Sequence, residues 1–379
     1  MDIKKILSEM IARGASDLHI KAASPPCFRI NGTLVYSEHP APTVQEMAAV
    51  AQQILTPNQR GEFENTKEID FAFGVPGVAR FRANFYVQRG SVAMVFRHVP
   101  VDIQSLEDLG LPTVVADLAL RTRGMILVTG TVGSGKSTTL ASIVDIINTR
   151  SARHVITIED PIEFLHRDNK SIISQREIGC DTNSYGEALK HVLRQDPDVI
   201  LIGEIRDQES MKIALTAADT GHLVLGTMHT TDATQTVSRI ISFFPPHQHQ
   251  EIRYLLASTL AAVISQRLVT DAEGLTRYPA VEIMINTGTI REYIREADKT
   301  VMIRQAIQEG FVQHQMQTFD QSLMQLYKEG KIALEAAMKA SSNPAEFELR
   351  VRGIHASSDT TWDAFEDATT SPEHEISRI

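Results

Sequence analysis

The segment Gly130-Thr-Val-Gly-Ser-Gly-Lys136-Ser137 has the residue types and the spacing of a phosphate-binding loop. It matches the pattern G-x-x-x-x-G-K-[ST] in full, and it stands between a predicted strand (125–129) and a predicted helix (137–148). Its glycines let backbone N–H groups turn toward phosphate oxygens, and the start of a helix favours negative charge. We expect Lys136 to reach the β and γ phosphates of a nucleotide and the Ser137 hydroxyl to ligate Mg²⁺. The alternative, a flexible glycine turn without a ligand, does not explain the flanking strand and helix. The predicted nucleotide-binding residues of this loop are Gly130, Thr131, Gly133, Ser134, Gly135, Lys136, Ser137 and Thr138.

Two acidic positions could supply the further groups that hydrolysis needs, an acid near Mg²⁺ and a base that positions water. In open α/β sheets such groups lie at the carboxyl ends of the strands next to the phosphate site. The run Glu159-Asp-Pro-Ile-Glu163 follows a predicted strand (154–158), and Glu204 follows another (198–203). Many P-loop enzymes end the second strand with Asp, so here Glu204 is expected to do the acidic work. Each acid taken singly is equally well a solvated loop residue.

Two imidazoles flank a third predicted strand (223–227). His222 precedes this strand and His229 follows it, and either ring is a candidate to sense or bond the γ-phosphate. Polar groups at the ends of three strands behind one P-loop together favour catalysis over chance.

The elements that must position these residues fall into regions with different patterns. Residues 1–98 combine a short amphipathic helix and a helix at 47–55 with alternating strand-like segments and turn signals, which predicts an α+β domain with an antiparallel sheet. Residues 99–123 read as a linker and a first helix. Residues 288–353 are predicted to be helical, and the acidic residues 354–379 to be a disordered tail.

Residues 124–287 alternate short apolar strands with helices, which predicts a parallel sheet covered on both faces. The expected strands are 125–129, 154–158, 198–203, 223–227 and 281–285. The expected helices are 136–148, 185–195, 207–219, 231–241 and 247–266.

Composition excludes several classes of protein. The 379 residues are 42% hydrophobic and 22% charged, which is typical of a globular protein of two or three domains. The net charge of −10 disfavours non-specific binding to nucleic acid. Residues 355–379 hold six acids and one base, so about half of that charge lies in the tail and a local basic groove stays compatible with the total. Two cysteines suggest no zinc site or disulfide framework, and no run approaches the roughly 20 apolar residues of a membrane span.

Several segments resemble the motifs of the type II/IV secretion ATPases. GTVGSGKST, ITIEDPIEF (156–164), SIISQREIG (171–179), LRQDPDVILIGEIRD (193–207) and TGHLVLGTMHT (220–230) are similar to their Walker A, Asp box, linking, Walker B and His box motifs. SDLHI (16–20), RFRANFYVQRG (80–90) and MQTFDQSLMQLYKEGKI (316–332) resemble the pilus retraction branch, the PilT/PilU type. The resemblance covers about 350 residues.

This resemblance implies an N-terminal PAS-like domain, a RecA-like ATPase core and C-terminal helices, assembled as a homohexamer that hydrolyses ATP with Mg²⁺. It further implies a cytoplasmic motor at the inner-membrane face of the pilus machinery, which retracts type IV pili for twitching motility. The expected partners are a pilus platform protein in the inner membrane and a paralogous pilus ATPase, with no nucleic acid and no direct membrane insertion. By position, Glu163 resembles the catalytic base, Glu204 the Walker B acid near Mg²⁺, and His222 and His229 the His box. Arg80, Arg82 and Arg97 resemble the N-terminal arginines that approach nucleotide, although Arg97 also fits an ordinary strand position.

Two departures from the family pattern keep alternatives open. Walker A reads TVGSGKS in place of the usual PTGSGKS, which changes only the loop entrance and spares Lys136. The retraction signature AIRNLIRE is replaced by TIREYIRE (289–296), with Glu292 and Tyr293 at the changed central positions. An accessory retraction paralogue is therefore an alternative to a principal motor.

Three other classes remain as rivals. A pilus extension or type II secretion ATPase usually carries a further N-terminal domain and a four-cysteine zinc insertion, and no Cys-x-x-Cys pair occurs here. A nucleic-acid motor predicts a basic channel with aromatic residues, but only 6% of residues are aromatic and Trp362 is the one tryptophan. A regulatory ring that binds nucleotide without turnover is separated from a motor only by an ATPase assay.

Overall fold

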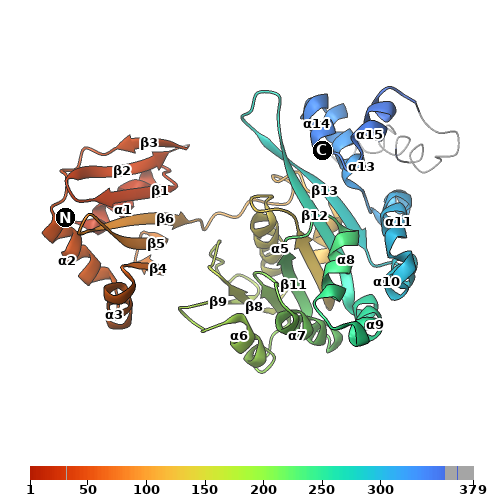
Figure 1. The fold of residues 1–379 in the computed structure, drawn as a ribbon, viewed down its shortest axis with the longest axis horizontal. Coiled ribbons are helices and arrows are strands. Elements are labelled where there is room, and N and C mark those ends of the chain that lie inside the picture. Colours follow the sequence, from red (N-terminus) through yellow and green to blue (C-terminus); the bar gives the residue numbers. More distant parts are fainter. Residues whose placement is uncertain (31, 355–364, 366–379) are drawn as a thin grey trace. The chain divides into compact units, whose positions relative to one another are not determined.

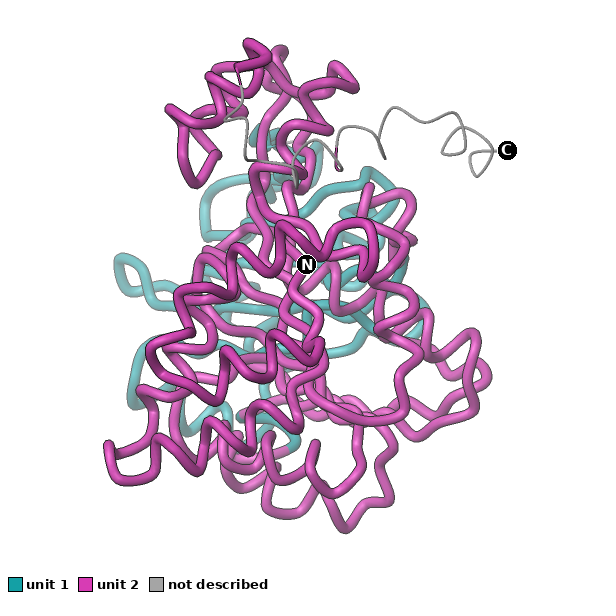
Figure 2. Tube along the Cα trace, turned by 90° about the vertical axis from the view of Figure 1, so that its right-hand side faces the viewer, with its two compact units in different colours: residues 1–102, 161–165, 179–181 teal, residues 103–160, 166–178, 182–379 magenta. Residues whose placement is uncertain are grey.

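The computed structural model describes residues 1–30, 32–354 and 365, which form two compact units (Figure 2). Unit 1 comprises residues 1–102, 161–165 and 179–181, and unit 2 comprises 103–160, 166–178 and the described residues from 182 onward. Apart from Ile354 and Phe365, the predicted disordered tail lies outside the described residues. Within the described ranges no helix is both long enough and apolar enough to cross a membrane.

Unit 1 contains a six-stranded antiparallel sheet in the order β3-β2-β1-β6-β5-β4, as the alternating sequence pattern predicts (Figure 1). Its strands are β1 (Asp17–Lys21), β2 (Ser24–Ile30), β3 (Thr33–Tyr36), β4 (Glu68–Val75), β5 (Ala79–Gln88) and β6 (Ser91–Val99). Its helices are α1 (Ile3–Ala12), α2 (Val44–Ile54) and α3 (Pro57–Thr66). The apolar stripe of α1 and the inward residues of the sheet share one core, in which Phe81, Phe85 and Phe96 are fully buried. Helix α3 was not predicted because it has no buried residue, and it begins at a capping box formed by Thr56.

Unit 2 is built on a seven-stranded sheet in the order β13-β12-β7-β11-β10-β8-β9, in which only β13 runs antiparallel to its neighbour. Its strands are β7 (Gly124–Thr129), β8 (His154–Glu159), β9 (Ile172–Glu177), β10 (Val199–Ile202), β11 (Leu223–Met228), β12 (Leu260–Thr270) and β13 (Arg277–Ile285). Along β10, Val199 and Leu201 belong to one hydrophobic cluster, while Ile200 and Ile202 belong to another. Because successive side chains point to opposite faces, both faces of the sheet are covered, as expected for short β-branched strands between helices.

The helices of unit 2 carry the chain between these strands and continue beyond β13 (Figure 1). They are α4 (Val114–Ala119), α5 (Lys136–Arg150), α6 (Tyr185–Val192), α7 (Gln208–Asp219), α8 (Ala233–Ser242), α9 (His249–Thr259), α10 (Gly288–Arg295), α11 (Ile303–Glu309), α12 (Phe311–His314), α13 (Phe319–Lys328), α14 (Leu334–Ala340) and α15 (Pro344–Val351). Two short 3₁₀ helices, η1 (Pro246–Gln248) and η2 (Ala297–Met302), join some of them.

The predicted helix over 247–266 is wrong in its second half. Helix α9 ends at Thr259, and β12 begins at Leu260 and pairs with β7 on one side and β13 on the other. The first seven residues of β12 are all buried, so they show no alternation of apolar and polar residues. A fully buried strand and a buried helix look alike in such a run, and the place of the segment beside β7 decides between them. Strand β9, at the far edge of the sheet, was also not expected from the pattern.

Candidate nucleotide-binding site

The phosphate-binding loop leaves the carboxyl end of β7 and enters α5 (Figure 1). Three of its glycines have positive φ, with values of 144° at Gly130, 77° at Gly133 and 94° at Gly135, which residues with side chains rarely adopt. Space is also missing at the first of them. A Cβ on Gly130 would lie 2.5 Å from the backbone oxygen of Gln266 and 2.5 Å from Oγ of Ser134. The turn that the motif predicts is therefore fixed both by backbone conformation and by packing.

Lys136 is the buried cation of this loop. Its side chain curls back so that Nζ donates to the carbonyl oxygens of Gly130 and Thr131, at 2.9 Å each, and only 8% of the residue is exposed. Burial lowers the pKa of Lys136, and the negative charge of Glu204 partly offsets this effect. An ammonium group so placed can donate a charge-assisted hydrogen bond to an anionic ligand, as phosphate binding requires.

The oxygen groups around the loop fit a nucleotide with its divalent cation. Oγ of Ser134 is buried and has no hydrogen-bond partner among the described residues, so a ligand oxygen would satisfy it. Ser137 is exposed on the first turn of α5, and the Glu204 carboxylate acts electrostatically on the same loop. A hydroxyl and a carboxylate are hard oxygen ligands of the kind that Mg²⁺ prefers.

Glu204 lies just beyond the end of β10 and contacts two side chains, Arg206 and His229. Arg206 contacts both carboxylate oxygens, with Nε 2.5 Å from Oε1 and Nη2 2.6 Å from Oε2. His229, from the segment after β11, places Nε2 3.0 Å from Oε1. Burial raises the pKa of Glu204, but hydrogen bonds and charge from Arg206 and His229 outweigh it and bring the pKa below its usual value. The carboxylate therefore stays ionised next to the phosphate loop.

Arg206 is a residue of this cluster that the sequence analysis did not single out. Arg206 is only two positions from Glu204 in the sequence, and that short distance was the signal that could have identified it. Helix α7 begins only after this segment, at Gln208.

Close packing around position 203 explains why a glycine precedes Glu204. A Cβ on Gly203 would lie 2.9 Å from the hydroxyl oxygen of Tyr185 and 3.1 Å from the backbone oxygen of Ile158. The Asp that many P-loop enzymes have at a strand end would not fit at position 203. The next residue, Glu204, thus carries the acid, in agreement with the sequence prediction of its place.

His222 lies at the other end of the sheet from the phosphate loop, which contradicts its predicted contact with the γ-phosphate of the same chain. Its backbone oxygen accepts from Gly124 at the start of β7, whereas the loop follows Thr129 at the end of that strand. Its Nδ1 lies 3.0 Å from the backbone oxygen of Ala217 and 3.1 Å from Oγ1 of Thr220, so it closes the turn between α7 and β11. The residues before a strand and those after it lie at opposite ends of that strand. In this parallel arrangement only His229, which follows β11, lies at the carboxyl end, where the phosphate loop leaves β7.

Glu163 belongs to unit 1, where Arg82 of β5 pairs with it. Nη1 of Arg82 lies 3.1 Å from Oε1 of Glu163, and both side chains are partly exposed. Residue 163 thus lies in a short segment that leaves the core sheet after β8 and joins the other unit. The role of Glu163 as a base stays a prediction.

The other two candidate arginines also lie on the sheet of unit 1, Arg80 on β5 and Arg97 on β6. Arg97 stands opposite Asp17 of β1, and its Nε donates to Oδ1 of Asp17 at 2.7 Å. Burial raises the pKa of Asp17, but hydrogen bonds from Arg97 and Ser16 lower it overall. Arg97 therefore has a structural role in the sheet, whether or not it also meets nucleotide.

A P-loop at the carboxyl edge of a mostly parallel sheet, with a buried lysine and the acid of a neighbouring strand, defines a P-loop nucleotide-binding site. Comparison with known proteins narrows the class. The profile of the type II/IV secretion system proteins matches residues 1–339. The chain therefore belongs to the type II/IV secretion family, and it is an ATPase of that family.

Individual relatives span nearly the whole chain. The type IV pilus retraction ATPase PilT of Pseudomonas aeruginosa is 44% identical over 347 residues, which are 92% of this chain and 100% of the relative. The type IV pilus ATPase PilU of the same organism is 37% identical over 355 residues, which are 93% of this chain and 92% of the relative. A crystal structure of the pilus retraction motor PilT with bound ADP aligns with a TM-score of 0.85 and 45% identity, and covers 92% of this chain and 99% of that chain.

Proposed function

We propose that this protein is a motor that hydrolyses ATP to retract type IV pili. The observation that carries the proposal is the buried Lys136 beside an ionised Glu204, in a chain that matches a pilus retraction ATPase over that relative's full length. The bound ADP of the related PilT structure supports an adenine nucleotide as the ligand of the loop. The proposed architecture is an N-terminal PAS-like domain and a RecA-like core, assembled as a homohexameric ring.

The residues of the site divide the work in this proposal. Lys136 binds the β and γ phosphates, and Ser137 and Glu204 hold Mg²⁺, which stabilises the charge that develops on the phosphates. His229 contacts Glu204 and is placed to respond when the γ-phosphate is lost. Glu163 is the base that orients the attacking water, and Arg80, Arg82 and Arg97 approach nucleotide from a neighbouring subunit.

The proposed setting is the cytoplasmic face of the inner membrane, where ring motion would pass to a pilus platform protein and pilin subunits would return to the membrane. The family likeness supports this setting. Deletion of the gene followed by complementation tests it, with retraction of labelled pili and twitching as the readouts. The wild-type chain should restore retraction and Glu163→Gln should not. Normal retraction in the deletion strain would exclude a principal motor.

An accessory retraction paralogue is the second candidate, because TIREYIRE departs from the retraction signature and PilU is also a relative. The changed residues are accommodated on α10. Glu292 is exposed and pairs with Lys299 at 2.6 Å, and Tyr293 packs against the hydrophobic cluster of unit 2. Deletion of this gene alone and together with any retraction paralogue separates the two roles. An accessory motor fails to restore retraction in the double deletion, and a principal motor restores it alone.

A further inference from the structure

The segment that carries His229 is only four residues long, from the end of β11 at Met228 to the start of α8 at Ala233. The conformation of this segment determines whether the imidazole of His229 reaches the carboxylate of Glu204. Nε2 of His229 lies 3.0 Å from Oε1 of Glu204. Strand β11 fixes the first end of the segment. The second end depends on how the N-terminus of α8 is held.

Two carboxylates hold that helix N-terminus. Asp232, the N-cap residue, accepts from the backbone N–H of Gln235 at 2.7 Å. The first N–H of the helix, on Ala233, donates to Oε1 of Glu282 at 2.9 Å, in a buried contact between residues 49 positions apart. Glu282 is 4% exposed, so it is an acid enclosed in the protein and directed at the start of α8.

Glu282 also connects α8 to the strand that leads into the phosphate loop. On β13 it stands opposite Ser265 of β12, whose Oγ lies 2.8 Å from Oγ1 of Thr129. Thr129 is the last residue of β7 before the loop. The strands that position Lys136 therefore also position the segment that carries His229.

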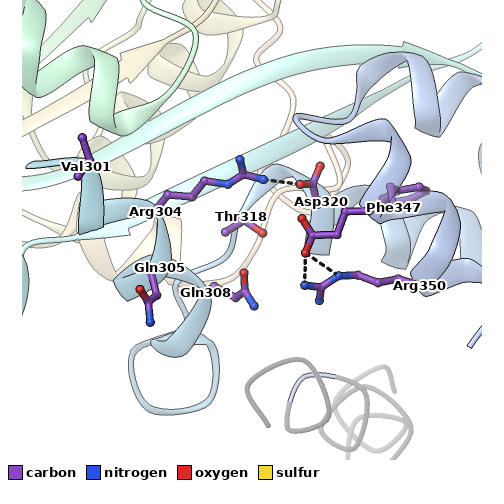
Figure 3. Close-up of a pocket in the computed structure, with 9 residues that line it drawn as sticks. Val301, Arg304, Gln305, Gln308, Thr318, Asp320, Phe347 and Arg350 are labelled. Carbon is purple, nitrogen blue, oxygen red and sulfur yellow. Dashed lines mark hydrogen bonds and ion pairs between the residues drawn. The ribbon is translucent and has the colours of Figure 1, made fainter. Parts of the chain in front are cut away.

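Other charges face Glu282 from three elements: Asp232 before α8, Arg267 of β12 and Arg304 of α11. Burial raises the pKa of Glu282, and the charge of Asp232 adds to the rise. The hydrogen bond that Glu282 accepts from Ala233 and the charges of Arg267 and Arg304 lower it, and together these effects bring the pKa to about 7. Arg304 in turn pairs with Asp320 at 2.7 Å, on the wall of a cavity of about 250 Å³ between the C-terminal helices (Figure 3). Glu282 is therefore linked to the start of α8 by a hydrogen bond and to Arg304 of α11 by charge.

We propose that Glu282 is a positioning residue for ATP turnover, which fixes the start of α8 through Ala233 and so holds His229 against Glu204. The inference rests on the proposed role of His229 in hydrolysis. The positioning role of Glu282 requires an acceptor oxygen at the distance that a Glu side chain reaches. It does not require a negative charge on that side chain.

Reach and charge can be separated with conservative variants of the full chain. Glu282→Asp keeps the carboxyl group and withdraws the oxygen by one methylene, while Glu282→Gln keeps an acceptor oxygen in place. Ala233→Pro removes the donor, at a first helical position where proline is tolerated, and Asp232 before it is already extended. Glu273→Asp, an exposed acid in the turn between β12 and β13, is the matched control. Thermal unfolding confirms that each variant is folded.

The readouts are kcat and KM for ATP, and the Kd of a fluorescent ADP analogue. We expect Glu282→Asp and Ala233→Pro to lower kcat about tenfold with Kd changed less than about twofold, and Glu282→Gln to keep kcat within about threefold. In combination with His229→Ala, Glu282→Asp should lower kcat no further, because both act through one group.

The proposal would be overturned by equal losses in the Asp and Gln variants, by losses that multiply with His229→Ala, or by a Kd that rises as kcat falls. A wild-type chain without ATPase activity would defeat the proposed function itself. An active wild type with an unaffected Glu282→Asp variant would remove only the role of Glu282.

Discussion

Replacement of Gly130 by alanine tests how the phosphate loop is built. At this position φ is 144°, and an added Cβ would lie 2.5 Å from the Gln266 backbone oxygen and 2.5 Å from Ser134 Oγ. Ordinary contacts of a Cβ begin at 3.4 Å, so each neighbour would have to move by about 0.9 Å. The Gln266 oxygen belongs to β12, which is paired with a strand on each side and cannot move alone, so the displacement falls on the loop.

The magnitude follows from two costs. A side chain in the positive-φ region costs of order 1–3 kcal/mol. Overpacking by one methyl group against a fixed backbone costs about 1–3 kcal/mol more. We therefore expect Gly130→Ala to lower the free energy of unfolding by about 2–6 kcal/mol. A displaced loop should also weaken nucleotide binding by about tenfold or more, which corresponds to about 1.4 kcal/mol or more.

Comparison of Gly130→Ala with Gly221→Ala separates the backbone cost from the packing cost. Within the described part of the chain, a Cβ on Gly133 (φ 77°) or Gly221 (φ 103°) would meet no atom within 4 Å. Gly221→Ala should lower stability by about 1–3 kcal/mol and leave ADP affinity unchanged, since it tests the backbone cost away from the site. Denaturant unfolding and titration with a fluorescent ADP analogue measure the two effects. If Gly130→Ala binds ADP as tightly as the wild type and unfolds like Gly221→Ala, the close packing of the loop against β12 is refuted.

Three further outcomes are expected. Lys136→Ala should weaken nucleotide binding about 10- to 100-fold, because it removes a charged donor to phosphate, and unchanged binding in a titration would refute the P-loop assignment. Glu163→Gln should bind ATP but turn over about 10²- to 10⁴-fold more slowly, and an undiminished kcat would remove Glu163 from the role of base. For Glu282, burial raises the pKa from 4.5 to about 7, so the folded state keeps a proton that the unfolded chain releases. The free energy of unfolding should therefore fall by about 3 kcal/mol as pH rises from 4.5 to about 7, relative to Glu282→Gln. Parallel stability curves for wild type and Glu282→Gln, measured by denaturant unfolding across this range, would contradict this expectation.

The sequence predicted the parts of the site that one continuous segment determines. The loop from Gly130 to Lys136 is such a part, because its glycines set the backbone conformation and the strand and helix that flank it are local. Strands β7, β8, β10 and β11 were predicted from short apolar runs, and the place of Glu204 followed from the end of its strand. The antiparallel sheet of unit 1 was predicted from alternation and turn signals.

Contacts between distant segments could not be predicted in this way. Whether the residues after Thr259 form helix or strand depended on the free edge of β7, which only the folded sheet offers. The pair of Glu282 with Ala233 joins residues 49 positions apart, and no periodicity of the sequence marks it. His222 was misplaced although the parallel direction of β11 already assigned it to the opposite edge of the sheet.

By itself, then, the sequence determined the phosphate-binding loop, the family and the acid that follows β10. The reason is that these depend on backbone conformations and motifs written in neighbouring residues. The tertiary structure alone showed the contacts themselves: His229 and Arg206 meet the same carboxylate of Glu204, and the buried Glu282 of β13 accepts a hydrogen bond from the first N–H of α8. These are consequences of strand order and register, which bring together side chains that the chain itself keeps far apart.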